Sequence, residues 1–362
     1  MSSIGIIANP ASGKDIRRLV SYATTIDNQE KVNIVKRIVL AAQAMGVDTI
    51  WFMPDTFQIG WAAIEDLSRD EKLTAACRLL EMPLTATSQD TTTAATEMEQ
   101  LGVGCIVVLG GDGTSRAAAK GVKKVPLLPL STGTNNVYPE MLEGTVAGMA
   151  AAIAAQFLDP NICCIQDKQI EVKLNESLTD IALIDAVISD DLCVGSKAIW
   201  DPSKLQYIFV TRCHPASIGF STAAGCLKIV RDTDDYGLSV ELQTDGEKII
   251  APIAAGVLSE LEIAQTKLMP LNRPKKLLLQ EDCMVALDGE RELRGHAGDT
   301  LTFTVTRHGP WRVQAKKALE EAVRRSFFCG RQNNRYQIIR RCVHGTRNPY
   351  AKAGLDYGGG IH

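Results

Sequence analysis

Short apolar runs alternate with helix-type stretches through the first 160 residues. The runs at residues 4–8, 105–109 and 125–130 have the length of buried strands. Apolar positions within residues 32–45 recur at helical spacing, and residues 85–101 form another candidate helix. This alternation predicts a doubly wound α/β domain with a parallel sheet.

The hydrophobic period changes near residue 160. Short segments of strand character then recur with turn residues between them, at residues 170–174, 181–188, 205–211, 227–230, 238–242, 284–287 and 301–305. Such a series is typical of antiparallel sheets. We therefore expect an α/β nucleotide-binding domain followed by a β-rich, sandwich-like second domain.

The change of period suggests domain limits. We assign residues 1–143 to the nucleotide-binding domain and residues 144–313 to the β-rich domain, with the alanine-rich stretch 144–157 as a helix that leads out of the first domain. A helix over residues 314–328 is expected to pack back on the first domain. Residues 329–362 form a basic tail, for which solvation or a contact with a subunit or anionic partner are the alternatives.

The most informative segment is Gly-Gly-Asp-Gly-Thr at residues 110–114, which directly follows the apolar run 105–109. Glycines between a strand and a helix let a phosphate approach the helix N-terminus closely. A carboxylate there repels phosphate unless it holds a metal or accepts a proton from an attacking hydroxyl, so Asp112 is predicted to be catalytic. The predicted phosphate-binding residues are Gly110, Gly111, Gly113 and Thr114. The alternative is a simple turn at the end of a core strand.

A second loop, Ser-Thr-Gly-Thr-Asn-Asn at residues 131–136, follows the next apolar run. Parallel strands joined by a helix end at the same edge of a sheet, so both loops should face one pocket. The residues expected to bind phosphate or ribose oxygens are Thr132, Gly133, Thr134 and Asn135. Helix capping by these residues is the alternative.

A third loop, Asn-Pro-Ala-Ser-Gly-Lys at residues 9–14, follows the first apolar run. It lacks the spacing of a Walker loop, and no Gly-x-Gly-x-x-Gly follows a strand in this chain. Asn9, at the end of the first apolar run, is a candidate phosphate contact. The alternative is a solvated turn residue.

Together the three loops resemble those of the superfamily of NAD kinases, diacylglycerol kinases and sphingoid kinases. The shared marks are Asn-Pro-x-Ser-Gly, Gly-Gly-Asp-Gly-Thr and Gly-Thr-x-Asn. The version at residues 132–140 is most similar to the ATP-NAD kinase-like proteins X of acetoin catabolism. The resemblance implies two domains, with the phosphates of ATP and the acceptor meeting between them and Asp112 activating the acceptor hydroxyl.

Further matches lie downstream. Residues 182–188 are similar to the NAD kinase stretch in which an Asn-Glu pair grips a ribose, but this chain has Ile184 and Asp185 there, which counts against NAD itself. Ser217 lies in a stretch similar to the small-residue loop that NAD kinases use near the nucleotide. Glu290 ends a segment similar to the Asp-Gly-Glu of lipid kinases, although Asp-Gly between two strands also predicts a plain hairpin. Asp185, Ser217 and Glu290 are thus candidate acceptor-binding residues.

Composition agrees with an enzyme of this kind. The chain has 362 residues, 45% hydrophobic and 22% charged, enough for two domains. Its net charge is only −3 and aromatic residues make up 5%, so we expect no nucleic-acid partner. Neither a signal-type N-terminus nor an apolar run of membrane-spanning length is present, so we expect a cytoplasmic protein without stable membrane association.

Cysteine and histidine give no metal-binding pattern. The ten cysteines include the adjacent pair Cys163 and Cys164 but no Cys-x-x-Cys, so neither a zinc site nor a disulfide framework is predicted. Among five histidines, only His214 lies near a segment of interest, and a surface position is its alternative. No protein motif for direct metal binding is present.

We therefore predict a kinase that transfers a phosphoryl group from ATP, with Mg²⁺, to an alcohol of NAD or a related nucleotide or polyol, with a link to acetoin catabolism. The resemblance implies a homodimer or larger homo-oligomer. One alternative is a lipid kinase, which Glu290 favours but which needs a membrane-docking surface. The other is a nucleotide-sensing accessory protein without turnover.

Overall fold

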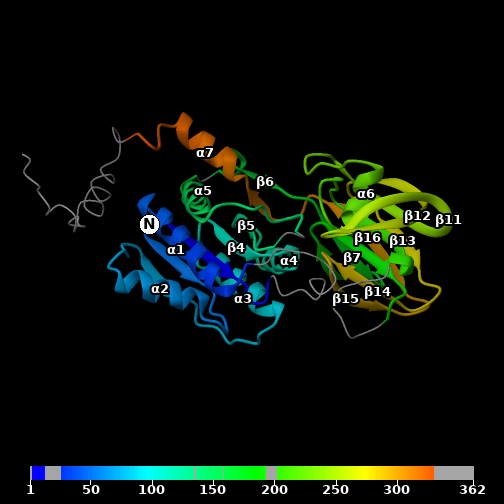
Figure 1. Cartoon of the computed structure of the whole chain (residues 1–362), viewed down its shortest axis with the longest axis horizontal. Coiled ribbons are helices and arrows are strands. Elements are labelled where there is room, and N and C mark those ends of the chain that lie inside the picture. Colours follow the sequence, from blue (N-terminus) through cyan, green and yellow to red (C-terminus); the bar gives the residue numbers. More distant parts are fainter. Residues whose placement is uncertain (1, 13–25, 134–135, 158, 193–201, 330–362) are drawn as a thin grey trace, which may run out of the picture.

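Two parts lie side by side in the molecule, an α/β part and a β-rich part (Figure 1). The computed structural model describes residues 2–12, 26–133, 136–157, 159–192 and 202–329. Within these ranges, no helix is both long and apolar enough to cross a membrane.

The α/β part is built on a seven-stranded sheet in the order β3-β2-β1-β4-β5-β17-β6. The strands are β1 (Ser3–Ala8), β2 (Thr49–Phe52), β3 (Ala76–Leu79), β4 (Ile106–Gly110), β5 (Leu127–Ser131), β6 (Cys164–Gln166) and β17 (Trp311–Val313). The first five are parallel, and the order reverses direction between β1 and β4. The doubly wound prediction is confirmed, with its topological switch point between β1 and β4.

Helices cover both faces of this sheet. They are α1 (Asn28–Ala44), α2 (Ile59–Arg69), α3 (Ser88–Gln100), α4 (Asp112–Gly121), α5 (Gly144–Gln156) and α7 (Ala315–Arg324). α1, α2, α5 and α7 share one hydrophobic core, whereas α3 and α4 pack in another. α1 begins where the Asp27 side chain accepts a hydrogen bond from the Glu30 N–H, and its apolar stripe faces the sheet.

α5 lies in the core of the α/β part, between α1 and α7. We assigned this helix to the second domain as its entry segment. Its small side chains let α1 approach so closely that a Cβ at Gly148 would lie 2.4 Å from the carbonyl oxygen of Ile38. The small alanine and glycine side chains of α5 therefore let this helix pack closely against the first part.

The second part consists of two antiparallel sheets, in the orders β12-β11-β10-β9-β14-β15 and β13-β16-β7-β8. Their strands are β7 (Gln169–Leu174), β8 (Ser177–Ala182), β9 (Asp185–Ser189), β10 (Leu205–Val210), β11 (Tyr236–Ala254), β12 (Val257–Pro270), β13 (Lys275–Leu278), β14 (Cys283–Leu287), β15 (Glu290–Gly295) and β16 (Thr300–Thr306). Phe209 and Phe303 stack between the sheets with ring centroids 4.2 Å apart. The predicted β-rich sandwich is confirmed.

Two strand predictions in this part are wrong. Residues 227–230 follow α6 (Phe220–Leu227) and form only an isolated bridge between Cys213 and Val230, because the small residues before them fold as a helix. Residues 181–188 divide into β8 and β9. The residues between the two strands leave the sheet and pack against the first part.

Candidate functional site

Three loops meet at the β1–β4 switch point. The side-chain amide of Asn9 donates to the Thr114 hydroxyl at 2.8 Å. The Thr132 hydroxyl donates to the Ser12 hydroxyl at 2.9 Å, and the Thr132 N–H donates to the Gly110 carbonyl at 3.2 Å. The loops after β1, β4 and β5 are thus joined directly, at the edge where open α/β sheets bind ligands.

Asp112 is the first residue of α4 and is half-buried. Its Oδ1 accepts the N–H groups of Val137 at 3.0 Å and Tyr138 at 2.8 Å. The carboxylate therefore ties the start of α4 to the chain that follows the β5 loop. Its predicted role toward an acceptor hydroxyl stays a prediction, and any such role must be compatible with these two contacts.

The glycines of the β4 loop are packed too tightly for any side chain. A Cβ at Gly110 would lie 2.5 Å from the Thr114 hydroxyl oxygen, and one at Gly113 would lie 2.6 Å from a carboxylate oxygen of Glu290. At Gly111 it would meet the Asn136 side-chain oxygen at 2.8 Å. The groups that lie over this loop therefore pack directly against its backbone.

The other residues of the β5 loop are only partly described. The Gly133 carbonyl accepts the Ser131 hydroxyl at 2.6 Å and the Asn136 amide at 3.3 Å. Thr134 and Asn135, both predicted to bind the nucleotide, lie outside the described residues.

Glu290 reaches the site from the second part. Asp288 and Gly289 form a two-residue turn between β14 and β15, with φ of 50° and 81°. Positive φ at both positions is what a tight hairpin requires, so the hairpin interpretation of Asp-Gly is confirmed. The same turn carries Glu290 to Gly113, so this candidate does lie beside the β4 loop.

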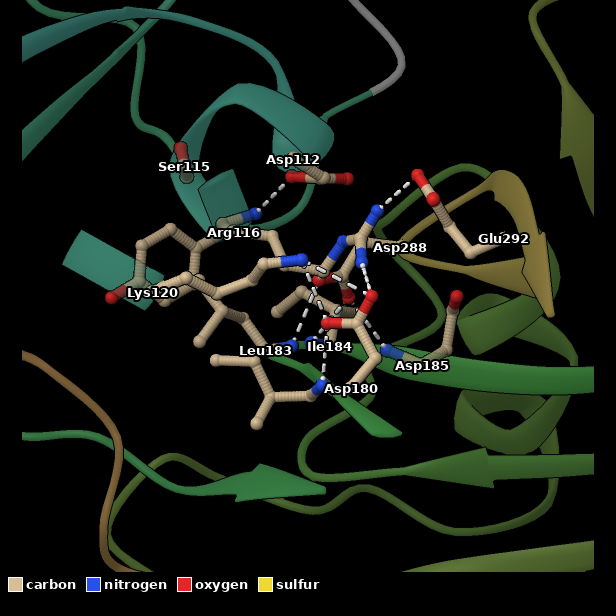
Figure 2. Close-up of polar contacts among 12 residues, drawn as sticks. Asp112, Ser115, Arg116, Lys120, Asp180, Leu183, Ile184, Asp185, Asp288 and Glu292 are labelled. Carbon is tan, nitrogen blue, oxygen red and sulfur yellow. Dashed lines mark hydrogen bonds and ion pairs between the residues drawn. The ribbon is translucent and has the colours of Figure 1, made fainter. Parts of the chain in front are cut away.

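Asp288 is a site residue that the sequence analysis did not single out. Its buried carboxylate accepts three N–H groups, from Leu183 at 2.8 Å, Ile184 at 2.7 Å and Asp185 at 3.1 Å (Figure 2). Burial raises the pKa of Asp288, against the opposing effects of Arg116 and these N–H groups. The available signal was its position in the hairpin turn directly before Glu290.

Arg116, one helical turn after Asp112, was also missed. It is 3% exposed, and it donates to Asp180 at 3.0 Å and to Glu292 at 2.5 Å, while its Nε lies 3.9 Å from Asp288 (Figure 2). Burial opposes the charge, but the surrounding carboxylates raise the pKa of Arg116. We name Asp180, Asp288 and Glu292 the acidic collar. Through this collar, the helix that begins with Asp112 is fastened to the second part.

The contact between the two parts also has an apolar half, and we call the whole contact the seam. The loop between β8 and β9 fills this apolar half. Leu183 and Ile184 are each 1% exposed and belong to a core cluster that includes Val108 and Ala118 of the first part. Position 184 is therefore part of the hydrophobic packing between the two parts. The Asp185 N–H donates to the Asp288 carboxylate, and the Asp288 N–H donates to the Asp185 carbonyl. The role of Asp185 in acceptor binding stays a prediction.

Ser217 and His214 lie in the loop before α6. The Ser217 N–H donates to the His214 carbonyl at 3.1 Å, and the exposed His214 ring accepts the Ala216 N–H at 2.9 Å. These local contacts fit a surface loop histidine. Acceptor binding by Ser217 remains a prediction.

The residues at the switch point suit a nucleoside triphosphate. α4 begins without a side-chain cap, and the hydroxyls of Thr114 and Thr132 lie at its start. A cavity of about 340 Å³ adjoins the β5 loop at Ser131 and Thr132, and its wall includes Ile34 of α1. Among the described residues, no group of three or more metal-binding side chains is present.

Comparisons with known proteins agree with this architecture. Residues 4–158 match the family described as ATP-NAD kinase N-terminal domain, and residues 168–308 match the acetoin catabolism protein X C-terminal domain. The chain is 38% identical to acetoin catabolism protein X of Cupriavidus necator over 317 residues, covering 84% of this chain and 88% of that protein. These matches confirm the resemblance drawn from the three loops.

Two solved structures align with most of the chain at low sequence identity. Yeast NADH kinase complexed with NADH aligns with a TM-score of 0.49 at 14% identity, covering 92% of this chain and 90% of that one. A putative diacylglycerol kinase from Bacillus anthracis aligns with a TM-score of 0.41 at 11% identity, covering 86% of this chain and 96% of that one.

Proposed function

Because this chain belongs to the family of acetoin catabolism protein X, with an N-terminal domain of the ATP-NAD kinase family, we propose that it is an ATP-dependent phosphotransferase. Its acceptor is an alcohol of NAD or a related nucleotide or polyol, in a step linked to acetoin catabolism. The observation that carries the proposal is the direct hydrogen bonding of the Asn9, Gly110 and Thr132 loops at the switch point beside Asp112.

In this proposal the start of α4 binds the phosphates. The N–H groups at its uncapped N-terminus and the hydroxyl of Thr114 donate to phosphoryl oxygens, and the Thr132 hydroxyl does so on giving up its bond to Ser12. Bound Mg²⁺ offsets the charge of the triphosphate. The absence of side chains at Gly110 and Gly113 makes room for the Thr114 hydroxyl and the Glu290 carboxylate beside the start of α4.

Asp112 and Glu290 bracket the place of the acceptor. Asp112 is held by two backbone N–H groups, so its carboxylate has a fixed orientation. It orients the acceptor hydroxyl or accepts its proton, while Glu290 lies beside Gly113, the next residue of α4. The acidic collar places Glu290 by fixing its strand against α4.

An ADP-release screen tests the proposal. NAD, NADH, sugars, polyols, and sphingoid and glycerolipid acceptors are offered with ATP and Mg²⁺ to the wild type and to Asp112→Asn. General-base help is worth about 10² to 10⁴ in rate, so the variant should lose turnover by about that factor with an unchanged circular dichroism spectrum.

The matched control is Glu65→Gln, which changes an exposed acid on α2 to its amide and should leave turnover unchanged. A loss of less than threefold in Asp112→Asn would remove Asp112 from the mechanism. Release of ADP only with lipid acceptors would instead identify a lipid kinase.

A nucleotide-sensing protein without turnover is the second candidate. It is favoured by Asp112, whose carboxylate serves two backbone N–H groups, and by Ile184, which lies in the hydrophobic seam. Calorimetry that detects ATP or NADH binding, together with no ADP release from any acceptor, would support this candidate over the kinase.

A further inference from the structure

Two arginines share a buried cluster where the chain passes between the two parts. Arg312 of β17 is fully engaged, with Nε 2.7 Å from Asp167 and Nη2 2.8 Å from Asp232. Arg212, which follows β10, has only long contacts, with Nη1 3.6 Å from Asp167 and 3.9 Å from Asp232. Asp167 and Asp232 thus make their short contacts with Arg312 and only longer contacts with Arg212.

The remaining donors of Arg212 have no hydrogen-bond partner among the described residues. Its Nε and Nη2 are both buried, although the side chain as a whole is 15% exposed. A buried donor without an acceptor costs about 1–3 kcal/mol, and more when the group is charged. Such groups are rare in folded proteins, and an unobserved ligand or water is a usual explanation.

The two donors lie on one edge of the guanidinium. Nε–H and Nη2–H point in the same direction and match the two oxygens of a carboxylate or a phosphate, which is the arrangement of a bidentate pair. We propose that this edge of Arg212 binds the anionic group of the acceptor, a carboxylate or a phosphate monoester. This inference rests on the proposed function and narrows its substrate class to anionic alcohols.

Arg212 is connected to Asp112 through a single residue. Its guanidinium lies 4.9 Å from the centre of the Tyr138 ring, and the Tyr138 N–H donates to Asp112 at 2.8 Å. Tyr138 is itself fixed, because its hydroxyl donates to Asp167 at 2.8 Å. Tyr138 thus links the guanidinium of Arg212 to the carboxylate of Asp112, which is the arrangement that an acceptor with an anionic group and a hydroxyl would use in this proposal.

The position of Arg212 in the chain fits the same role. Arg212 lies between β10 and the loop that carries Ser217, the candidate acceptor contact on the second part. An anion at this point would be held between the two parts. We therefore assign Arg212 to acceptor selection, and the phosphates of ATP to the switch-point loops.

The test follows the arginine Nε–H signals by NMR while inorganic phosphate or acetate is added to the full chain. One Nε–H signal, which has contacts with the Tyr138 ring and is absent from Arg212→Lys, should shift and saturate. Arg212→Lys keeps the charge but loses the bidentate edge, and it should weaken the preferred anion at least tenfold. Arg294→Lys, an exposed arginine paired with Asp282 at 3.0 Å, is the matched control and should bind like the wild type.

Comparison of the two anions separates a phosphate acceptor from a carboxylate acceptor. A wild-type Nε–H signal that neither anion shifts, or equal binding by Arg212→Lys, would overturn the inference. If Arg212→Lys does not fold, the wild-type titration still decides. The Arg312 guanidinium also lies 5.8 Å from the Tyr138 ring, but its Nε–H is held by Asp167 and should not shift. These readouts need no turnover, so saturable binding at Arg212 without ADP release would reject the kinase and keep the anion site.

If the screen finds an acceptor, a kinetic comparison adds a second test. Arg212→Lys should raise the KM for that acceptor at least tenfold and change kcat by less than threefold. An unchanged KM would reject the role of Arg212 while the proposed function stands.

Discussion

Replacement of Arg116 by methionine tests how the two parts are held together. Methionine keeps much of the length and the apolar stem of the side chain but removes the charge. The change leaves the acidic collar of Asp180, Asp288 and Glu292 without its buried cation. The collar is the polar half of the seam, and the apolar half remains intact.

The contacts set the size of the effect. Removing one partner of a buried ion pair costs about 3–5 kcal/mol. Two of the three contacts are close, but the Glu292 side chain is 28% exposed and the Asp288 contact is 3.9 Å long. We therefore expect the lower end, about 3 kcal/mol at pH 7, which is roughly a hundredfold shift in the unfolding equilibrium.

The penalty should also depend on pH. Without Arg116, the buried Asp288 loses the cation that opposes the effect of burial, so its folded-state pKa rises further above the unfolded value. The stability of the variant is then greatest at low pH, where Asp288 is protonated, and falls as the pH rises through that raised pKa. The difference between wild type and Arg116→Met should therefore be largest at pH 7 and shrink toward pH 4.

Urea unfolding followed by far-ultraviolet circular dichroism at pH 7 and pH 5 measures both effects. The control is Arg294→Met, because the side chain of Arg294 is 52% exposed and an exposed pair contributes about 1 kcal/mol at most. A loss in Arg116→Met no larger than in this control, or a loss that is the same at both pH values, would refute the reasoning.

Three further predictions concern Ile184 and Gly113, at the contact between the two parts, and Lys168. Ile184→Asn should lose about 3 kcal/mol of stability in urea unfolding, because the new amide would be buried without partners. Calorimetry should show no gain in NAD affinity, and a stable variant with tighter NAD binding would contradict this prediction. Gly113→Ala should cost about 1–3 kcal/mol by displacing Glu290, and adding Glu290→Ala should restore part of the loss; strictly additive losses would show that the two residues do not meet. Burial, together with the charge of Arg307, lowers the pKa of Lys168 to about 8. The stability of the wild type relative to Lys168→Met should therefore rise between pH 8 and about 10.5. A difference in urea midpoints that does not change over this pH range would contradict the prediction.

Local patterns were enough to predict the three loops. β1, β4 and β5 are short apolar runs followed by glycine and hydroxyl residues, and the rule that parallel strands end at one edge brings their loops together. Gly110 and Thr132 were therefore expected to be neighbours, and the family resemblance added Asn9 to them. Their hydrogen bonds agree with that expectation.

Partners far apart in the sequence were beyond the reach of such patterns. Arg116 and Glu292 are 176 residues apart, and nothing in either segment indicates the other. Residues 181–188 were predicted as one strand because all-apolar stretches look the same whether they face a sheet core or another domain. Leu183 and Ile184 face the other part, which divides the strand in two.

The chain leaves the α/β part through β6 and returns through β17, and these two strands pair with each other at the end of the first sheet. Both covalent connections therefore lie along one short ribbon, and bending of that ribbon is the simplest way for the two parts to separate. Arg116 and the acidic collar join the parts through α4, away from the ribbon, so the free energy of their ion pairs opposes such a separation. How readily an acceptor enters would then depend on the free energy of these ion pairs as much as on the fit of the acceptor to the site.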